Sequence, residues 1–82
     1  MNAQVPLKSS TLASLKAGQT AIVFDILGET VLARRLLEMG LVPGTRLHVI
    51  RRAPLGDPIE IEVRGYLLTL RVLEAENVRV AF

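Results

Sequence analysis

The sequence predicts a mainly β protein, a small barrel of about five short strands in one domain. Two observations lead to this prediction. Segments rich in β-branched and other apolar residues alternate with glycine and proline turns along most of the 82 residues. Half of the residues are hydrophobic and 22% are charged, which is the balance of a folded domain. Because a small open sheet exposes its edges, we expect the strands to close on themselves.

The start of the chain predicts a flexible extension over residues 1–11, followed by the domain over residues 12–82. The extension is polar and ends in hydroxyl residues that suit a helix cap. Leu12 and Leu15 are three residues apart, which favours a single helical turn, and Gly18 follows where the chain would leave it. We expect this turn to close one end of the barrel.

The segment Gln19–Leu27 is predicted to be the first strand, because β-branched and aromatic residues dominate it. From Thr30 the period changes to that of an amphipathic helix, with Leu32, Leu36 and Met39 at positions i, i+4 and i+7. One helix is therefore expected as an insertion after the first strand.

Glycine and proline mark the end of this helix. Gly40 suits the left-handed position after the last turn, and Leu41 suits the next position, where it would contact Leu36 as in a Schellman motif. Pro43 and Gly44 suit the two central positions of a type II turn. The chain is thus expected to turn back sharply toward the sheet.

The second strand is predicted over Thr45–Arg52. Leu47 and Val49 share its apolar face, and the other face is expected to carry Arg46, His48, Ile50 and Arg52. The following segment, Ala53–Pro58, consists largely of turn residues and predicts a loop.

A hairpin comes next. Its first strand alternates apolar and charged residues, and a two-residue turn at Arg64-Gly65 would place three apolar pairs on one face: Ile59 with Leu70, Ile61 with Leu68, and Val63 with Tyr66. A bulged turn of three or four residues is the alternative, because Arg64 would need a positive φ in the tighter turn.

A helical turn at residues 74–76 and a closing strand over residues 77–81 complete the chain. The predicted order is a strand, an inserted helix, a three-strand meander, a helical turn and a last strand. This is the order of elements in an SH3-like barrel. We expect Phe24 and Tyr66 to lie in its core.

Residue chemistry argues against an enzyme and against a metal or cofactor site. The chain has no cysteine and one histidine, His48, whereas a transition-metal site gathers several ligands. We expect Glu60 and Glu62 to pair across the sheet with Arg46 and Arg52 rather than to bind metal. No hydroxyl residue has an assignable partnership with histidine and aspartate. We therefore expect no catalytic residue, no cofactor and no bound metal.

Charge and hydropathy argue against three further classes of protein: nucleic-acid-binding, membrane-spanning and secreted proteins. The formal net charge of +2 is a small excess for a nucleic-acid-binding surface. The apolar runs are far shorter than the roughly 20 residues that cross a bilayer, and the start lacks the pattern of a secretory signal. We expect a cytoplasmic protein.

Four runs of sequence together resemble one family. The runs Arg35–Thr45 (RLLEMGLVPGT) and Arg52–Ile61 (RAPLGDPIEI) are the most specific, and Leu12–Gly18 and Arg64–Arg71 accompany them. In this order they are similar to the ferrous iron transport protein A (FeoA) family, and the similarity extends from Leu12 to Val80. The resemblance implies an SH3-like barrel and a cytoplasmic accessory protein of ferrous iron uptake. The implied partner is a membrane GTPase and ferrous permease, ferrous iron transport protein B.

Two other functions stay open at this point. One is a regulatory domain, because similar SH3-like domains occur at the C-terminus of iron-dependent transcriptional repressors. The other is a small barrel that binds nucleic acid with little sequence preference, which would show a steep dependence on salt.

Contact with a protein partner is the function for which the sequence offers candidate residues, namely Arg34, Arg35, Glu38, Arg52, Leu55 and Asp57. The first three lie on the outer face of the predicted helix. Leu55 lies at the tip of a loop fixed by proline and glycine, where it is either an exposed anchor or folds back to cap the barrel. The arginines are either solvated charges paired with acids or parts of the contact.

Overall fold

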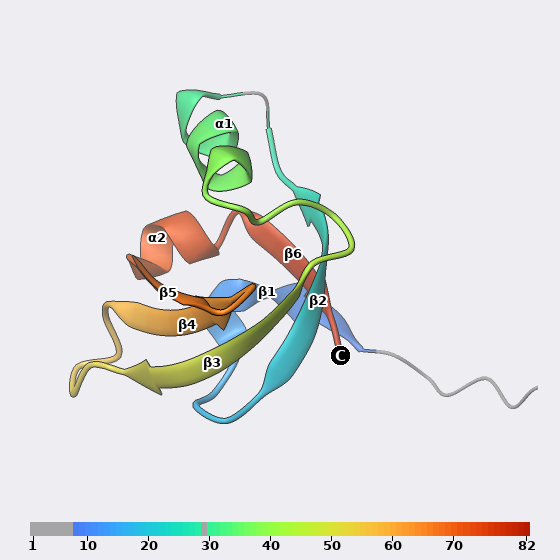
Figure 1. The fold of residues 1–82 in the computed structure, drawn as a ribbon. Helices are drawn as coiled ribbons and strands as arrows, with labels where there is room; N and C mark the ends of the chain where they lie inside the picture. The colour runs from blue at the N-terminus through green and yellow to red at the C-terminus, as the bar shows by residue number, and fades with distance from the viewer. Residues whose placement is uncertain (1–7, 29) are drawn as a thin grey trace, which may run out of the picture.

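The computed structural model describes residues 8–28 and 30–82, which form an antiparallel sheet of six strands in the order β1-β6-β2-β3-β4-β5 (Figure 1). The elements, in chain order, are β1 (Ser9–Thr11), the 3-10 helix η1 (Leu12–Ser14), β2 (Thr20–Ile26), α1 (Val31–Glu38), β3 (Arg46–Arg52), β4 (Ile59–Val63), β5 (Tyr66–Leu70), α2 (Val72–Ala75) and β6 (Val78–Ala81). The prediction of a mainly β fold with one inserted amphipathic helix is confirmed; the helix follows β2, the strand that was predicted to be the first.

Strand β1 lies where the sequence analysis placed part of the extension. Ser9 pairs with Ala81 and Thr11 with Arg79, both in β6. Lys8 adds two backbone hydrogen bonds to Phe82, with N···O distances of 2.6 and 2.8 Å. The extension was predicted to reach residue 11, but residues 9–11 form a strand instead. The sheet therefore has a sixth strand. The rest of the predicted extension, residues 1–7, lies outside the described part of the chain.

The two edge strands bring the ends of the sheet together. The edge strand β1 leads directly into η1, and the other edge strand, β5, leads almost directly into α2. These two short helices contact each other. The sheet thereby curls around a single core, as expected from the need to protect the edges of a small sheet.

Helix α1 begins and ends as the sequence predicts. The Thr30 side-chain oxygen accepts a hydrogen bond from the Ala33 N–H at 3.1 Å and caps the first turn. At the other end, Gly40 has a φ of 103°, the Gly40 N–H binds the Leu37 carbonyl and the Leu41 N–H binds the Leu36 carbonyl. These two bonds are those of the Schellman motif.

The type II turn after the helix is also present. The Thr45 N–H donates to the Val42 carbonyl at 3.1 Å, and Gly44, at the third position of the turn, has a φ of 94°. The turn is fixed to the sheet, because the Gly44 N–H binds the Val23 carbonyl and the Val23 N–H binds the Thr45 carbonyl.

Gly40 is the glycine whose replacement we expect to cost most. An added Cβ would overlap the Tyr66 hydroxyl group, which donates a hydrogen bond to the Met39 carbonyl. Gly40→Ala combines a left-handed backbone penalty of about 1–2 kcal/mol with the loss of a hydrogen bond worth about 1 kcal/mol. Gly44→Ala is the matched control, because its φ is similar but no atom lies within 4 Å of an added Cβ. Urea denaturation measures both variants, and equal losses of unfolding free energy would contradict the contact.

The hairpin of β4 and β5 has the predicted two-residue turn. Arg64 and Gly65 have φ values of 52° and 86°, and the register pairs Val63 with Tyr66, Ile61 with Leu68 and Ile59 with Leu70. The alternative of a longer bulged turn is excluded. Arg64 therefore adopts a backbone conformation that asparagine or glycine would occupy with less strain.

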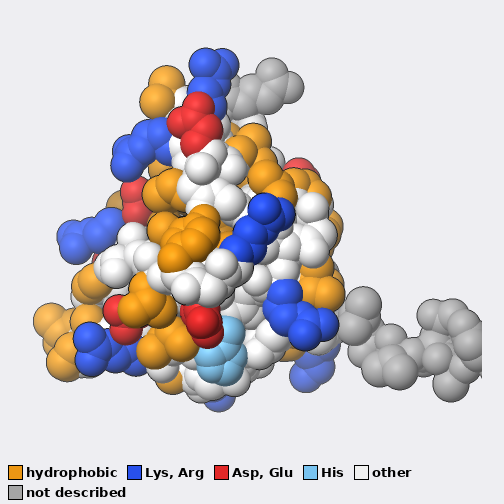
Figure 2. Space-filling view, in the orientation of Figure 1, with side chains coloured by type: hydrophobic (Ala, Val, Ile, Leu, Met, Phe, Trp, Pro, Cys, Tyr) orange, Lys and Arg blue, Asp and Glu red, His pale blue; other side chains and the backbone are white. Residues whose placement is uncertain are grey.

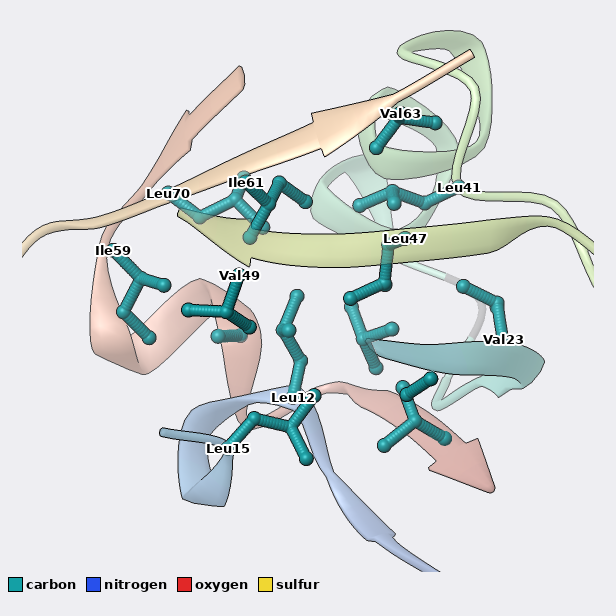
Figure 3. Close-up of a cluster of buried hydrophobic side chains, with 14 of the residues drawn as sticks. Leu12, Leu15, Val23, Leu41, Leu47, Val49, Ile59, Ile61, Val63 and Leu70 are labelled. Atoms are coloured by element: carbon teal, nitrogen blue, oxygen red, sulfur yellow. The ribbon is translucent and has the colours of Figure 1, made fainter. Parts of the chain in front are cut away.

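The core lies between the curled sheet and η1 (Figure 3). Leu12 and Leu15 enter it from one side, which confirms that the first helical turn closes the barrel. From the sheet and the helix end come a further set of fully buried side chains, Val23, Leu36, Leu41, Leu47, Val49, Ile59, Ile61, Val63, Val78 and Val80.

Two aromatic side chains expected in the core are instead half exposed. Phe24 and Tyr66 are each 43% exposed, so this part of the prediction is wrong. In β2 the small residues Ala21 and Val23 face the core, which turns Phe24 outward. Its ring lies 5.5 Å from the guanidinium carbon of Arg79, a cation–π distance.

Candidate functional site

The loop between β3 and β4 presents one leucine to solvent. Leu55 is 97% exposed, so the alternative in which it folds back to cap the barrel is excluded. The loop around it is internally bonded, because the Gly56 N–H binds the Ala53 carbonyl at 2.7 Å and the Ala53 N–H binds the Pro58 carbonyl at 3.0 Å. Leu55 is therefore held outward by a short, hydrogen-bonded loop.

Arg52 holds this loop to the rest of the barrel. A register shift between Val49 and Arg51 makes Ile50 an extra residue, so that Arg52 pairs with Ile59. Arg52 thus leaves the outer face on which the alternating pattern placed it, and that prediction is wrong. The bulge turns its guanidinium group toward the end of the barrel that η1 closes.

The hydrogen bonds of Arg52 connect the loop between β3 and β4 to the segment of η1. Its Nε donates to the Gly56 carbonyl at 3.2 Å, and its Nη1 donates to the carbonyls of Ala13 and Leu15 at 2.9 and 2.7 Å. Arg52 is half-buried, and three of its five N–H donors take part in these bonds. Arg52 therefore positions the loop.

Asp57 fixes the other end of the loop. Its Oδ1 accepts a hydrogen bond from the Val72 N–H at 3.1 Å, the first residue of α2, and lies 4.0 Å from the Nε of Arg71. A carboxylate at a helix N-terminus is favourable because it accepts a free backbone N–H. Asp57 therefore connects the loop that carries Leu55 to α2.

A second exposed leucine follows this connection. Leu73 comes directly after the residue that Asp57 binds, and it is 74% exposed. The sequence analysis missed it because it placed the helical turn at residues 74–76 rather than at Val72–Ala75. The signal that could have found it is a leucine next to a charged residue in a short helix, which is weak.

The helix residues lie elsewhere on the molecule. Arg34, Arg35 and Glu38 are exposed on α1, and Figure 1 shows α1 at the opposite end of the barrel from the β3–β4 loop. The structure thus divides the six candidates into two groups that it does not bring together. One is the leucine loop, which we define as Arg52, Leu55 and Asp57, and the other is the helix group, Arg34, Arg35 and Glu38.

The carboxylates of β4 have partners other than those expected. Glu60 forms an ion pair with Arg51, with Nε and Oε1 3.0 Å apart, and Glu62 lies opposite His48 in the sheet. The predicted pairing of Glu60 and Glu62 with Arg46 and Arg52 is therefore wrong; the bulge at Ile50 brings Arg51 opposite Glu60, whereas the position of Glu62 opposite His48 does not depend on the bulge. His48 is half-buried, and its Nδ1 lies 2.9 Å from the Thr20 hydroxyl group.

Within residues 8–28 and 30–82, no three His, Cys, Asp or Glu side chains gather as they would around a metal ion. We expect anaerobic calorimetric titration with Fe²⁺, and titration with Zn²⁺, to show no stoichiometric binding tighter than about micromolar. His48→Ala is the informative variant. Tight binding that this substitution abolishes would contradict the expectation.

Over the same described ranges, no helix has the length and hydropathy needed to cross a membrane.

A curled, six-stranded sheet with one inserted helix defines the class of small SH3-like domains, which agrees with the fold predicted from the sequence. The FeoA domain model matches residues 10–81 of the chain. The chain therefore belongs to the FeoA domain family, a family of ferrous iron transport.

Three known proteins illustrate the relationship. The Fe(2+) transport protein A/Fe(2+) transporter FeoB fusion protein of Porphyromonas gingivalis is 35% identical over 69 residues, which cover 84% of this chain and 8% of the fusion protein. The solution structure of FeoA from Chlorobium tepidum is 50% identical, with a TM-score of 0.78 over 85% of this chain and 67% of that one. FeoA from Stenotrophomonas maltophilia, a zinc complex described as an SH3 domain protein, is 31% identical, with a TM-score of 0.76 over 85% and 87%.

This chain spans less than a tenth of the length of the fusion protein. A manganese-dependent transcriptional repressor shares the fold, with a TM-score of 0.80 over 94% of this chain and 44% of that one, at 23% identity. The similarity to the repressor bears on fold alone.

Proposed function

We propose that this protein is a non-enzymatic, cytoplasmic accessory protein of ferrous iron uptake. It acts by binding the cytoplasmic region of a ferrous permease that carries a GTPase domain. The proposal is supported by membership of the FeoA family and by the fusion protein, in which a related domain and a FeoB transporter occupy one chain.

The observation that carries the proposal is the leucine loop. A leucine that is 97% exposed has no role in the core of this molecule. The hydrogen bonds made by Arg52 and Asp57 hold the loop on both sides, so little conformational entropy would be lost when Leu55 enters an apolar pocket of a partner. A pre-ordered apolar anchor is the arrangement that favours docking.

The helix group supplies the second element of the proposal. Among the described residues, Arg34 and Arg35 take part in no ion pair, and both are exposed on α1. Unpaired exposed charges of this kind accelerate association with a surface of opposite sign. We assign the helix group to the approach of the partner and Leu55 to the stability of the complex.

Calorimetric titration of the protein with the isolated cytoplasmic region of the FeoB transporter from the same organism tests the proposal. We expect saturable binding with one protein per permease, and no hydrolysis of GTP by the protein alone. Absence of binding at protein concentrations of about 100 μM would contradict the proposal. It would mean that the free energy of binding is weaker than about −5.5 kcal/mol.

A further inference from the structure

Two arginines, Arg46 and Arg64, border one hollow between the start of β3 and the hairpin turn after β4. The ladder between β3 and β4 pairs Leu47 with Val63 and His48 with Glu62. Arg46 begins β3 one residue before Leu47, and Arg64 follows Val63 as the first residue of the hairpin turn. Both arginines border the same hollow, where their like charges repel each other.

Neither of these arginines has an acidic partner. In the described part of the chain the ion pairs are Arg51–Glu60 and Arg71–Asp57. Arg64 makes one long hydrogen bond, 3.4 Å from its Nη2 to the Thr45 hydroxyl group. Among the described residues, the two positive charges are therefore not engaged in ion pairs, although Glu62 borders the same hollow.

The backbone at Arg64 is also unfavourable. Its φ of 52° is the one positive value at a non-glycine residue in the described ranges. Asparagine or glycine would occupy this turn position with less strain. Neighbouring like charges and a strained backbone at the same residue are local conflicts, and such conflicts occur in native proteins mainly at functional sites.

The two arginines line an open hollow. It has a volume of about 440 Å³ and is bordered by the turn at Gly44, by β3 as far as His48 and by the hairpin end from Glu62 to Gly65. Figure 2 shows this side of the molecule, with basic side chains close to the pale blue histidine and an acidic side chain beside it. The hollow therefore offers two guanidinium groups to an anion, with one carboxylate at its far side.

The chemistry of the hollow favours a carboxylate from a protein over a phosphate chain. Glu62 borders the same hollow and would repel a polyanion, whereas a single carboxylate between the arginines can avoid it. The hollow has no Phe, Tyr or Trp among its lining residues on which a nucleotide base could stack. Exposed apolar side chains flank it instead, with Ile22 opposite Arg46 and Leu67 opposite Glu62, as at the surface of a peptide-binding site.

We propose that Arg46 and Arg64 form a clamp for one acidic side chain, aspartate or glutamate, of a partner protein. Arginine pairs bind carboxylates through short, charge-assisted hydrogen bonds, and a bound carboxylate also cancels the repulsion between the two arginines. The inference rests on the proposed function in one respect, that a protein partner exists. It names the chemistry that the partner brings to this face, which is distinct from the leucine loop.

Amide NMR titration tests the clamp without the permease. The probes are the peptide acetyl-Ser-Glu-Val-Thr-amide, the same peptide with Gln in place of Glu, and inorganic phosphate, all at matched ionic strength. We expect saturable shifts of the amides of residues 44–48 and 62–65 with the Glu peptide, and at least tenfold weaker binding of the Gln peptide and of phosphate. Absence of saturable shifts with the Glu peptide, or tighter binding of phosphate, would overturn the proposal.

Variants separate the clamp from general charge effects. Arg46→Gln and Arg64→Asn should each weaken binding of the Glu peptide at least tenfold. Lys16→Gln, which removes the same charge from an exposed residue outside the hollow, should leave it unchanged. Equal losses in all three variants would show non-specific attraction and overturn the clamp.

A thermal measurement gives an independent readout. Arg64→Asn should raise the melting temperature of the free protein by a few degrees, because it removes both the backbone strain and one of two like charges at the hollow. An unchanged or lowered melting temperature would show that Arg64 does not destabilise the free protein, which would overturn the inference. If the peptide does not bind while the permease region is still captured, the clamp fails and the proposed function stands; the reverse result rejects the permease as partner and keeps the clamp.

Discussion

Ile61→Ala should lower the free energy of unfolding by about 2–5 kcal/mol, because it leaves a cavity in the hydrophobic core. Ile61 is fully buried and pairs with Val49 on one side and with Leu68 on the other. A domain of this size has a total stability of roughly 4–12 kcal/mol, so the loss is a large share of it. Urea denaturation followed by circular dichroism measures the change.

Glu62→Ala provides the control one residue away. Glu62 is exposed on the outer face of the same strand, so its replacement should change stability by less than about 0.5 kcal/mol. Similar losses for Ile61→Ala and Glu62→Ala would mean that β4 is not divided into a buried and an exposed face.

Leu55→Ser should weaken binding to the permease region by about 2 kcal/mol or more, roughly thirtyfold in Kd, if the leucine is the apolar anchor of the contact. The melting temperature should stay nearly unchanged, because the side chain is exposed in the free protein. The loss should appear mainly as faster dissociation, which surface plasmon resonance separates from association.

Three further substitutions separate the contribution of the helix group from that of Leu55. Arg34→Glu and Arg35→Glu should slow association in a salt-dependent way and change dissociation little. Val31→Ser, a matched control for the removal of an apolar side chain, replaces a residue that is 79% exposed on α1 and should have no effect on dissociation. An equal loss with Val31→Ser would remove the special role assigned to Leu55.

Turns and helix ends that depend only on neighbouring residues were predictable from the sequence. The Schellman motif at Gly40 and the type II turn at Gly44 depend on a few neighbouring residues whose backbone preferences are strong. The hairpin register followed from the two-residue turn at Arg64-Gly65, because the turn length fixes which residues face each other.

Features that depend on distant contacts were missed. Strand β1 has few apolar residues, and its pairing with β6 comes from backbone hydrogen bonds that the side chains do not reveal. The bulge at Ile50 adds one residue without any glycine or other signal, and it reverses the faces of Arg51 and Arg52. The cross-strand prediction for Glu60 failed for the same reason.

The candidate site was predictable in part. Two positions of Leu55 were predicted as alternatives, an exposed anchor and a cap of the barrel. The composition of the loop could not decide between them, and the structure shows the exposed position. Arg52 and Asp57 stay candidates for the contact, and the hydrogen bonds by which they support the loop could not be predicted because their acceptors and donors are distant in sequence. The position of Arg46 and Arg64 at one hollow could not be predicted, because the loop between β3 and β4 does not fix the register of these strands as a tight turn would.

Ferrous iron uptake by cells that carry the triple variant Leu55→Ser, Arg34→Glu, Arg35→Glu in place of the native chain tests the central claim most directly. The claim is that the protein works through an exposed surface on which its fold does not depend. We expect the variant to accumulate and to melt like the native protein, while uptake falls to the level of cells that lack the chain. A folded triple variant that supports full uptake would contradict the claim.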